Sequence, residues 1–154
     1  MSETIAISAQ NILHRWRIHR DVLRELVKVF PESSANFRPT PKVMSVVEMV
    51  HHLAWVPEFF FASIEERERY VPPVPQTLAD ARELLDELTI KHRSVISRFS
   101  EADLQREATI QVFNKTEPLA DILQRLITHE AHHKGQLITY ARLLDLEPPF
   151  YTIY

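Results

Sequence analysis

At 154 residues the chain has the length of one ordinary domain, and its 45% hydrophobic and 25% charged residues are typical of a soluble globular protein. A formal net charge of −3, with no basic block, gives nucleic-acid binding no electrostatic support. The absence of cysteine excludes disulfides, thiolate metal ligands and a cysteine nucleophile.

The N-terminus and the hydropathy pattern bear on localisation. Residues 1–4 lack the basic-then-apolar pattern of a signal peptide, and no apolar run approaches the about 20 residues that span a bilayer. We therefore expect a cytoplasmic protein with no membrane partner. The chain contains a single glycine, which favours helices, because sheet proteins use glycine in tight hairpin turns.

The first half of the chain predicts two helices. Apolar residues recur at three-to-four spacing from about residue 5 to residue 30, where a proline follows, and residues 32–43 read as a loop. The second helix begins with a capping box, in which Ser45 and Glu48 each satisfy a backbone N–H of the other. It continues to about residue 68, is apolar on nearly every face, and includes Pro57, which favours a kink.

The second half predicts two more helices. Residues 71–75 are proline-rich and predict a stiff connector. Thr77 then caps a third helix, whose apolar stripe continues to residue 99. Residues 109–113 are compatible with a short extended segment. The fourth helix is predicted to start at residues 116–118, with a proline in its first turn, and to run to about residue 145.

Four long amphipathic helices joined by loops predict an all-α fold, a four-helix bundle that forms one domain over residues 1–154. Metal and ligand sites in such bundles lie in the core, between facing helices. Polar side chains on the inward line of a helix are therefore the residues to examine.

Three of the eight histidines lie within five residues, at positions 129, 132 and 133. His129 and His133 are four residues apart, so a helix places them on one face, where they replace apolar residues on the inward line. His132 falls beside that line. A pair of buried imidazoles needs either hydrogen-bond acceptors or one shared metal ion. The spacing is compatible with both.

The second helix carries two neighbouring histidines, His51 and His52. Only one of them can face a given site, because successive helical residues point in different directions. Periodicity does not choose between them, since this helix is apolar on most faces.

Two motifs resemble a known family. Residues 45–54, SVVEMVHHLA, are similar to the helix-two motif of the DinB (DinB/YfiT-like) family, in which an acidic residue precedes a metal-binding histidine by four positions. Residues 129–136, HEAHHKGQ, resemble its second motif, two histidines four apart followed by a basic residue, glycine and glutamine. The resemblance covers essentially the whole chain. The family usually has a glycine where Asp145 or Leu146 stands here, a departure that concerns only the helix end.

The resemblance implies a ligand set and an architecture. The implied metal ligands are His52, His129 and His133. The implied fold is an up-down-down-up four-helix bundle, often dimeric, and an aromatic tail at residues 150–154 also favours a homodimer.

Three neutral imidazoles leave a divalent metal its positive charge and an open position, which is a catalytic pattern. Such a metal acidifies a bound water or an external thiol, so we expect the catalytic group to be that water or thiol. A thiol must arrive as a cosubstrate, because the chain has no cysteine. Imidazole suits several transition metals. Zinc or nickel is expected, with iron as a third candidate.

Several polar residues near the motifs have two interpretations. Glu48 is interpreted first as the capping residue and second as a catalytic candidate. Glu130 is expected at the surface or behind the ligands, and His132 at the surface or at a dimer contact. Gln136 and Tyr140 continue the inward line and suit either hydrogen bonding or packing.

Other positions carry simpler expectations. His19 lies on the inner stripe of the first helix and is a minor candidate for approach to the site. His14 and His92 are expected to be solvated. Gly135 lies in mid-helix, where glycine costs about 1 kcal/mol relative to alanine, so a close helix crossing is expected there.

Two functions follow. The first is an enzyme that performs metal-assisted hydrolysis, or transfer to a low-molecular-weight thiol, on an unidentified small-molecule substrate. The alternative is a non-catalytic metal-binding or stress-related bundle, whose metal fastens the second and fourth helices. A pocket above an open coordination position favours the enzyme. A fourth protein ligand, or a site sealed by Trp55 and Phe59, contradicts it.

Overall fold

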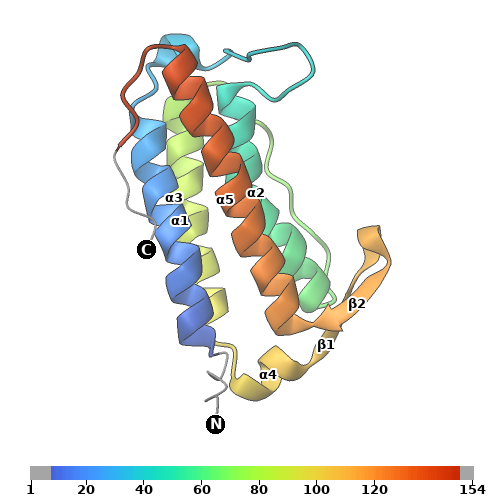
Figure 1. Cartoon of the computed structure of the whole chain (residues 1–154). Helices are drawn as coiled ribbons and strands as arrows, with labels where there is room; N and C mark the ends of the chain where they lie inside the picture. Colours follow the sequence, from blue (N-terminus) through green and yellow to red (C-terminus); the bar gives the residue numbers. More distant parts are fainter. Residues whose placement is uncertain (1–7, 150–154) are drawn as a thin grey trace.

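The computed structural model describes residues 8–149. Four long helices form a bundle (Figure 1). Helices α1 and α2 lie diagonally across it, since each packs against both α3 and α5. The predicted all-α four-helix bundle is thus confirmed. The long helices are α1 (Ala9–Lys28), α2 (Val46–Ile64), α3 (Leu78–Ser97) and α5 (Leu119–Leu143).

The order of helix directions is up-down-down-up, as the family resemblance implied (Figure 1). Because α2 and α3 run in the same direction, the segment between them returns along the length of the bundle (Figure 1). Residues 71–75 within it contain neither helix nor strand, which confirms the predicted connector. Two side chains of α2 hold the return segment: His51 Nε2 lies 2.7 Å from the Pro72 carbonyl oxygen, and Glu58 pairs with Arg67.

The first two helices begin where side chains cap them. Ser8 is extended and its Oγ accepts from Asn11 N–H at 3.1 Å, so α1 begins at Ala9; the predicted start near residue 5 lies outside the described residues. The predicted capping box of Ser45 and Glu48 opens α2 and is confirmed. Helix α2 ends at Ile64, earlier than predicted, and Glu66 just beyond it has φ 53°.

Short elements, most of which the sequence did not indicate, join the helices. The predicted extended segment at residues 109–113 is confirmed in part: an antiparallel hairpin runs through it, and Asn114 makes the turn with φ 47°. Its second strand includes Pro118, so α5 begins one residue later than predicted. The short elements are η1 (Glu32–Ser34), α4 (Glu101–Gln105), β1 (Glu107–Ile110), η2 (Gln111–Phe113) and β2 (Lys115–Pro118).

Two apolar clusters fill the bundle, one around Trp16 and Phe61 and the other around Leu23 and Leu53. On three of the helices, buried polar side chains separate the residues of one cluster from those of the other. They are Arg20 on α1, Thr89 and His92 on α3, and Glu130 and Lys134 on α5. Within the described residues, no helix combines the length and the apolar character needed to cross a membrane.

Arg20 is bonded to the other three long helices. Its guanidinium donates to Glu130 (Nη2 to Oε2, 2.9 Å), to Thr89 Oγ1 (3.2 Å) and to the Leu53 carbonyl oxygen (2.7 Å). That carbonyl is available because Pro57, four residues later, has no N–H to donate to it. Of the two positions expected for Glu130, at the surface or behind the ligands, the surface position was wrong, since the side chain is fully buried against Arg20.

The homodimer expected from the resemblance and from the aromatic tail stays a prediction. Residues 150–154, which form that tail, lie outside the described part of the chain.

Candidate metal centre

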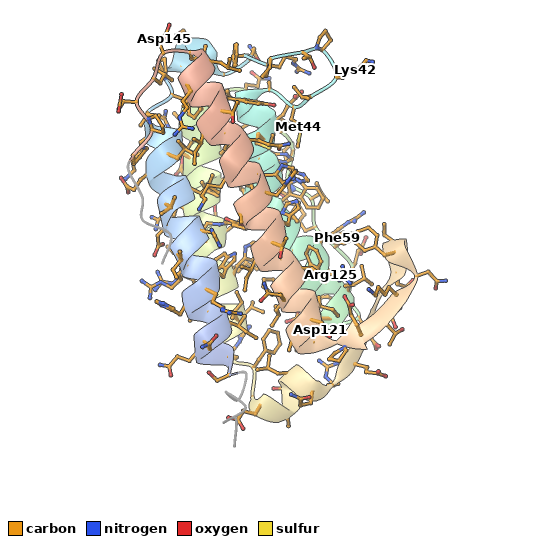
Figure 2. The ribbon with its side chains drawn as sticks, in the orientation of Figure 1. Lys42, Met44, Phe59, Asp121, Arg125 and Asp145 are labelled. Carbon is orange, nitrogen blue, oxygen red and sulfur yellow. The ribbon has the colours of Figure 1, made fainter. Side chains whose placement is uncertain are left out.

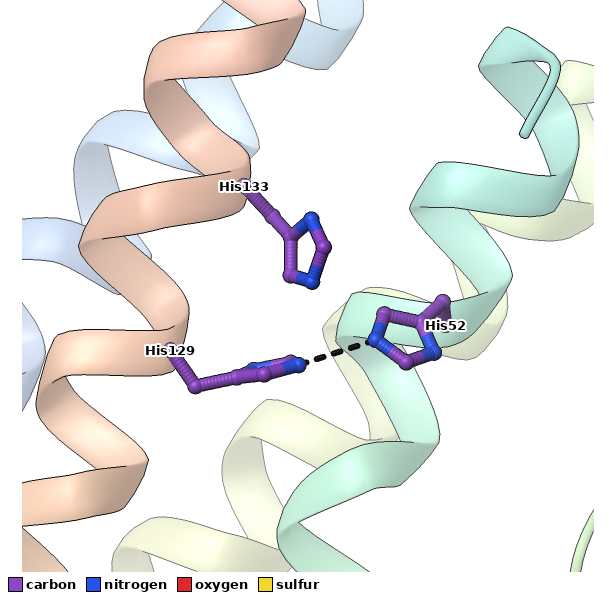
Figure 3. A group of neighbouring side chains, drawn as sticks. All are labelled: His52, His129 and His133. Atoms are coloured by element: carbon purple, nitrogen blue, oxygen red, sulfur yellow. Dashed lines mark hydrogen bonds between the residues drawn. The ribbon is translucent and has the colours of Figure 1, made fainter. Parts of the chain in front are cut away.

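Three histidines converge between α2 and α5 (Figure 3). His52 comes from α2, and His129 and His133 come from successive turns of α5. Their possible ligand atoms all lie within 4.8 Å of one another, close enough to hold one metal ion. The structure therefore brings together the three residues that the family resemblance implied.

The neighbouring histidine of α2 points elsewhere. His51 is buried and its Nε2 lies 2.7 Å from the carbonyl oxygen of Pro72. His52 instead places its Nε2 2.8 Å from the Nε2 of His129. The choice that helical periodicity left open is thus settled by how α2 packs: one imidazole faces the return segment and the other faces α5.

The surroundings of the three imidazoles favour their neutral form. Burial, together with the neighbouring histidines, lowers the pKa of His52 to about 4 and that of His129 to about 3. Burial also lowers the pKa of His133. A neutral imidazole has a free lone pair on one ring nitrogen, which is the form that binds a metal.

The contacts within the cluster fit a shared cation. The Nε2 atoms of His52 and His129 lie 2.8 Å apart, and their lone pairs repel unless a proton or a metal ion lies between them. His133 Nδ1 donates to Gln136 Oε1 at 2.7 Å, which leaves its Nε2 unprotonated. A hydrogen bond on the far ring nitrogen is how proteins orient metal-binding histidines.

The remaining candidates near the motifs have other partners. The Glu48 carboxylate accepts from Ser45 N–H at 2.7 Å and from Arg38 at 3.0 Å, so the capping interpretation is confirmed. The hydroxyl of Tyr140 donates to the Met44 carbonyl oxygen at 3.0 Å. Lys134 Nζ donates to His19 Nδ1 at 2.9 Å, which ties α5 to α1.

Two expectations about histidines held and one did not. His14 and His132 are exposed, as predicted, although the ring of His132 lies against His133 at 4.9 Å between centroids. His92 was expected in solvent but is fully buried, because α3 turns that face toward Phe61. Gly135 also differs from expectation: it is exposed, and a Cβ at this position would have no heavy atom within 4 Å, so no helix crosses closely there.

A pocket of about 270 Å³ opens beside the histidines. His52 and His129 line it, and Trp55 and Phe59 form walls without sealing it. Within residues 8–149 no fourth histidine, aspartate or glutamate joins the cluster. Neither feature named above as contradicting an enzyme is therefore seen in the described residues: no further histidine or acidic side chain joins the cluster, and Trp55 and Phe59 do not seal the pocket. The full lining comprises His52, Trp55, Val56, Phe59, Phe60, Arg69, Val112, Phe113 and His129.

The sequence pointed to neither Arg69 nor Phe113 as a site residue. Arg69 belongs to a charged run at residues 65–69, and Phe113 lies in the hairpin turn. Neither position carries a local signal, because the return segment and the hairpin reach the histidines only through tertiary folding. Gln136 did carry one, since it lies three residues after His133 on the same helical face.

Comparisons with known proteins agree with this fold. A family model described as the DinB superfamily matches residues 15–137. The uncharacterized protein YjoA of Bacillus subtilis is 27% identical over 147 residues, covering 93% of this chain and 96% of its own. The crystal structure of YjoA superposes with a TM-score of 0.74 at 26% identity, over 92% of this chain and 96% of that one.

Two further crystal structures share the fold at lower identity. A DinB-like protein from Bacillus cereus has a TM-score of 0.84 at 17% identity, with 96% of this chain and 100% of that chain covered. YfiT from Bacillus subtilis, described as a probable metal-dependent hydrolase with an unusual four-helix bundle topology, has a TM-score of 0.71 at 16% identity. That match covers 96% of this chain and 95% of YfiT.

Proposed function

The chain belongs to the DinB superfamily, and from that premise we propose that it is a metal-dependent hydrolase whose divalent ion is held by His52, His129 and His133. One observation carries the proposal: three imidazoles converge beside an open pocket, with no fourth histidine, aspartate or glutamate in the described part of the chain. The description of YfiT as a probable metal-dependent hydrolase supports the reaction class.

The chain's own residues have separate roles in this proposal. His52, His129 and His133 supply neutral donors, so the ion keeps its full charge. Gln136 holds the ring of His133 in orientation. When bound there, zinc or nickel acts as a Lewis acid that lowers the pKa of a water or thiol at its open position. The apolar walls of the pocket limit access of bulk water to the site.

Transfer to a small thiol is a second form of the same chemistry. The chain contains no cysteine, so a thiol reaches the site only as a cosubstrate. The two reactions differ in what occupies the open position, and the same residues serve both.

Metal content is the first test. We expect the purified protein, incubated with zinc or nickel and desalted, to retain about one ion per chain. His52→Ala, His129→Ala and His133→Ala should each lose most of it. His132→Ala is the matched control, because His132 is exposed on the same helix, and it should retain the ion. A wild-type protein that retains no transition metal overturns the proposal.

Activity is the second test. Metal-loaded and chelator-treated protein would be assayed on a panel of esters and amides, with and without a small thiol. Hydrolysis that depends on the metal supports the proposal. Binding of azide to cobalt-loaded protein, read from the visible spectrum, reports the open position independently. Stoichiometric metal with neither turnover nor an azide shift favours the non-catalytic alternative, in which the ion only fastens α2 to α5.

A further inference from the structure

We propose that the pocket beside the histidines binds an organic anion: an apolar, preferably aromatic, group that carries one carboxylate-type charge, which Arg69 recognises. The proposal names the substrate class of the site described above and so rests on the proposed function. Its evidence, however, is the pocket wall itself, which can be examined with and without metal.

The walls of the pocket are apolar and aromatic. Phe59 projects from α2 on the side where the β1–β2 hairpin lies (Figure 2), and its ring centroid is 6.1 Å from that of Phe113 in the hairpin turn. Trp55 continues the same face of α2 toward His52, with ring centroids 6.1 Å apart. Between these rings the pocket offers surfaces on which a flat apolar group can stack.

The size of the pocket suits a small ligand. Its volume of about 270 Å³ corresponds to roughly nine waters at their liquid volume of about 30 Å³ each. That is just below the about 300 Å³ at which ordinary ligand sites begin. One ring with a short side chain fits this space, whereas a large substrate must extend beyond it.

Arg69 is the cation of this pocket, and the aromatic walls hold it in place. Its guanidinium carbon lies 5.2 Å from the ring centroid of Phe59 and 5.9 Å from that of Trp55. Within residues 8–149 no carboxylate forms a salt bridge with Arg69. The nearby Arg67, in contrast, is bonded to Glu58 and Glu65. A guanidinium positioned by stacking, with its N–H groups free of a carboxylate, is prepared to receive an anion.

The sign of the ligand charge follows from the lining. No aspartate or glutamate lines the pocket, and its ionisable side chains are Arg69 and the two histidines, His52 and His129. A cationic ligand finds no carboxylate there and is repelled by Arg69. An anion finds Arg69, and the metal of the proposed function would add a second positive charge beside His52 and His129.

Arg69 also lines a second, neighbouring pocket. A larger space of about 680 Å³ shares Phe59, Arg69 and Val112 with the pocket and continues over Thr109 and Gln111. A substrate longer than one ring can therefore pass Arg69 and extend along the hairpin. This arrangement places the charged group of the ligand between an apolar end near the histidines and a more polar end outside.

The test is a comparison of four probes: 3-phenylpropionate, its neutral amide, 3-phenylpropylamine and acetate. Each is titrated by calorimetry into the full chain, both metal-free and zinc-loaded. In the metal-free protein we expect the carboxylate to bind about tenfold more tightly than the amide, the difference expected of one charge-assisted pair. The amine and acetate should bind more weakly still, since one carries the wrong charge and the other lacks the apolar group.

Variants locate the effect. Arg69→Gln should abolish the preference for the carboxylate over the amide while leaving amide binding nearly unchanged. Phe59→Ala should weaken both probes by a similar factor. Arg142→Gln, at an exposed position near the end of α5, is the matched control and should keep the wild-type preference. The wild-type comparison needs no variant, so the proposal stays testable even if Arg69→Gln folds poorly.

The outcomes separate the two proposals. Equal affinities for the carboxylate and the amide in metal-free wild-type protein, or a preference that survives Arg69→Gln, overturn the anion pocket. An Arg69-dependent preference in a protein that retains no metal supports the pocket and refutes the proposed function. Stoichiometric metal without any anion preference refutes the pocket and leaves the metal site standing.

Discussion

At the scale of single residues, Gln136 is the side chain that orients His133, one of the three histidines of the proposed metal site. Its Oε1 accepts from His133 Nδ1 at 2.7 Å and so directs the Nε2 of His133 toward the cluster. Gln136→Leu should weaken metal affinity by about tenfold or more, because supporting residues of this kind contribute 10- to 100-fold. Competition with a chromophoric chelator measures this. Gln124→Leu, at an exposed position of the same helix, is the control, and equal affinities in the two variants would contradict the role.

His92 is a second residue whose environment predicts a measurable effect. It is fully buried against Phe61, and neither ring nitrogen has a hydrogen-bond partner within the described residues. Burial, with smaller effects from Arg20 and Lys91, lowers its pKa from 6.5 to about 3. Between pH 6.5 and a pH of about 3, His92 therefore binds a proton in the unfolded chain but not in the folded chain. This contribution to stability is complete above pH 6.5 and is lost as the pH falls, by up to about 1.4 kcal/mol per pH unit.

Replacing His92 by leucine should therefore flatten the acid side of the stability profile. Urea unfolding of His92→Leu and of the wild type at pH 7, 6 and 5 gives the comparison. We expect the free energy of unfolding of the variant to rise relative to that of the wild type at each lower pH, because leucine binds no proton in the unfolded chain. Stability curves that stay parallel from pH 7 to pH 5 would show that His92 titrates equally in both states.

At the scale of secondary structure elements, α5 carries a removable defect. Gly135 is exposed in the middle of the helix, and a Cβ there meets nothing within 4 Å. Gly135→Ala should raise the free energy of unfolding by about 1 kcal/mol, since alanine restricts the unfolded chain and favours the helix. Urea denaturation of the variant and the wild type shows whether the free energy of unfolding rises. A less stable variant would reveal a contact of this face that the isolated chain does not show.

The junction of the four long helices depends on Arg20. Arg20→Met should cost about 3–5 kcal/mol, because it removes the guanidinium that pairs with the buried Glu130 carboxylate. The double variant Arg20→Met with Glu130→Leu should recover much of that loss, since it removes both charges. Urea denaturation of the two single variants and the double variant gives the coupling energy.

Arg17→Met is the surface control for this experiment. Arg17 pairs with Asp21 at 3.4 Å on the exposed face of α1, with 45% of its side chain accessible. Its loss should cost less than about 1 kcal/mol, as for other exposed ion pairs. An Arg20 variant no worse than Arg17→Met would mean that the buried pair adds nothing to the junction.

At the scale of the whole molecule, the proposed metal would join two helices that are distant in sequence. His52 lies on α2, and His129 and His133 lie on α5, so an ion bound by all three stabilises only the folded chain. Saturation at 100 times the dissociation constant adds about 2.7 kcal/mol. For a chain of this size that corresponds to a rise in melting temperature of about 5–10 °C. Thermal unfolding with and without a chelator measures it, and His52→Ala should not respond. Identical melting of loaded and chelated wild-type protein would contradict an ion that bridges α2 and α5.

The sequence by itself determined what depends on neighbouring residues. The capping box at Ser45, the cap at Thr77 and the connector at residues 71–75 are local features, and each is present as predicted. The common face of His129 and His133 follows from four-residue spacing on any helix. Together with the resemblance to the DinB family, these features sufficed for the bundle and its topology.

Only the tertiary structure decided which polar side chains lie inside. His92 was expected in solvent and Glu130 at the surface or behind the ligands, yet both are fully buried, as is Arg20, because burial depends on the neighbouring helices rather than on the residue's own sequence context. The pocket is the same case. Arg69 and Phe113 come from segments without periodicity, and they meet the histidines only because the return segment and the hairpin fold back over α2.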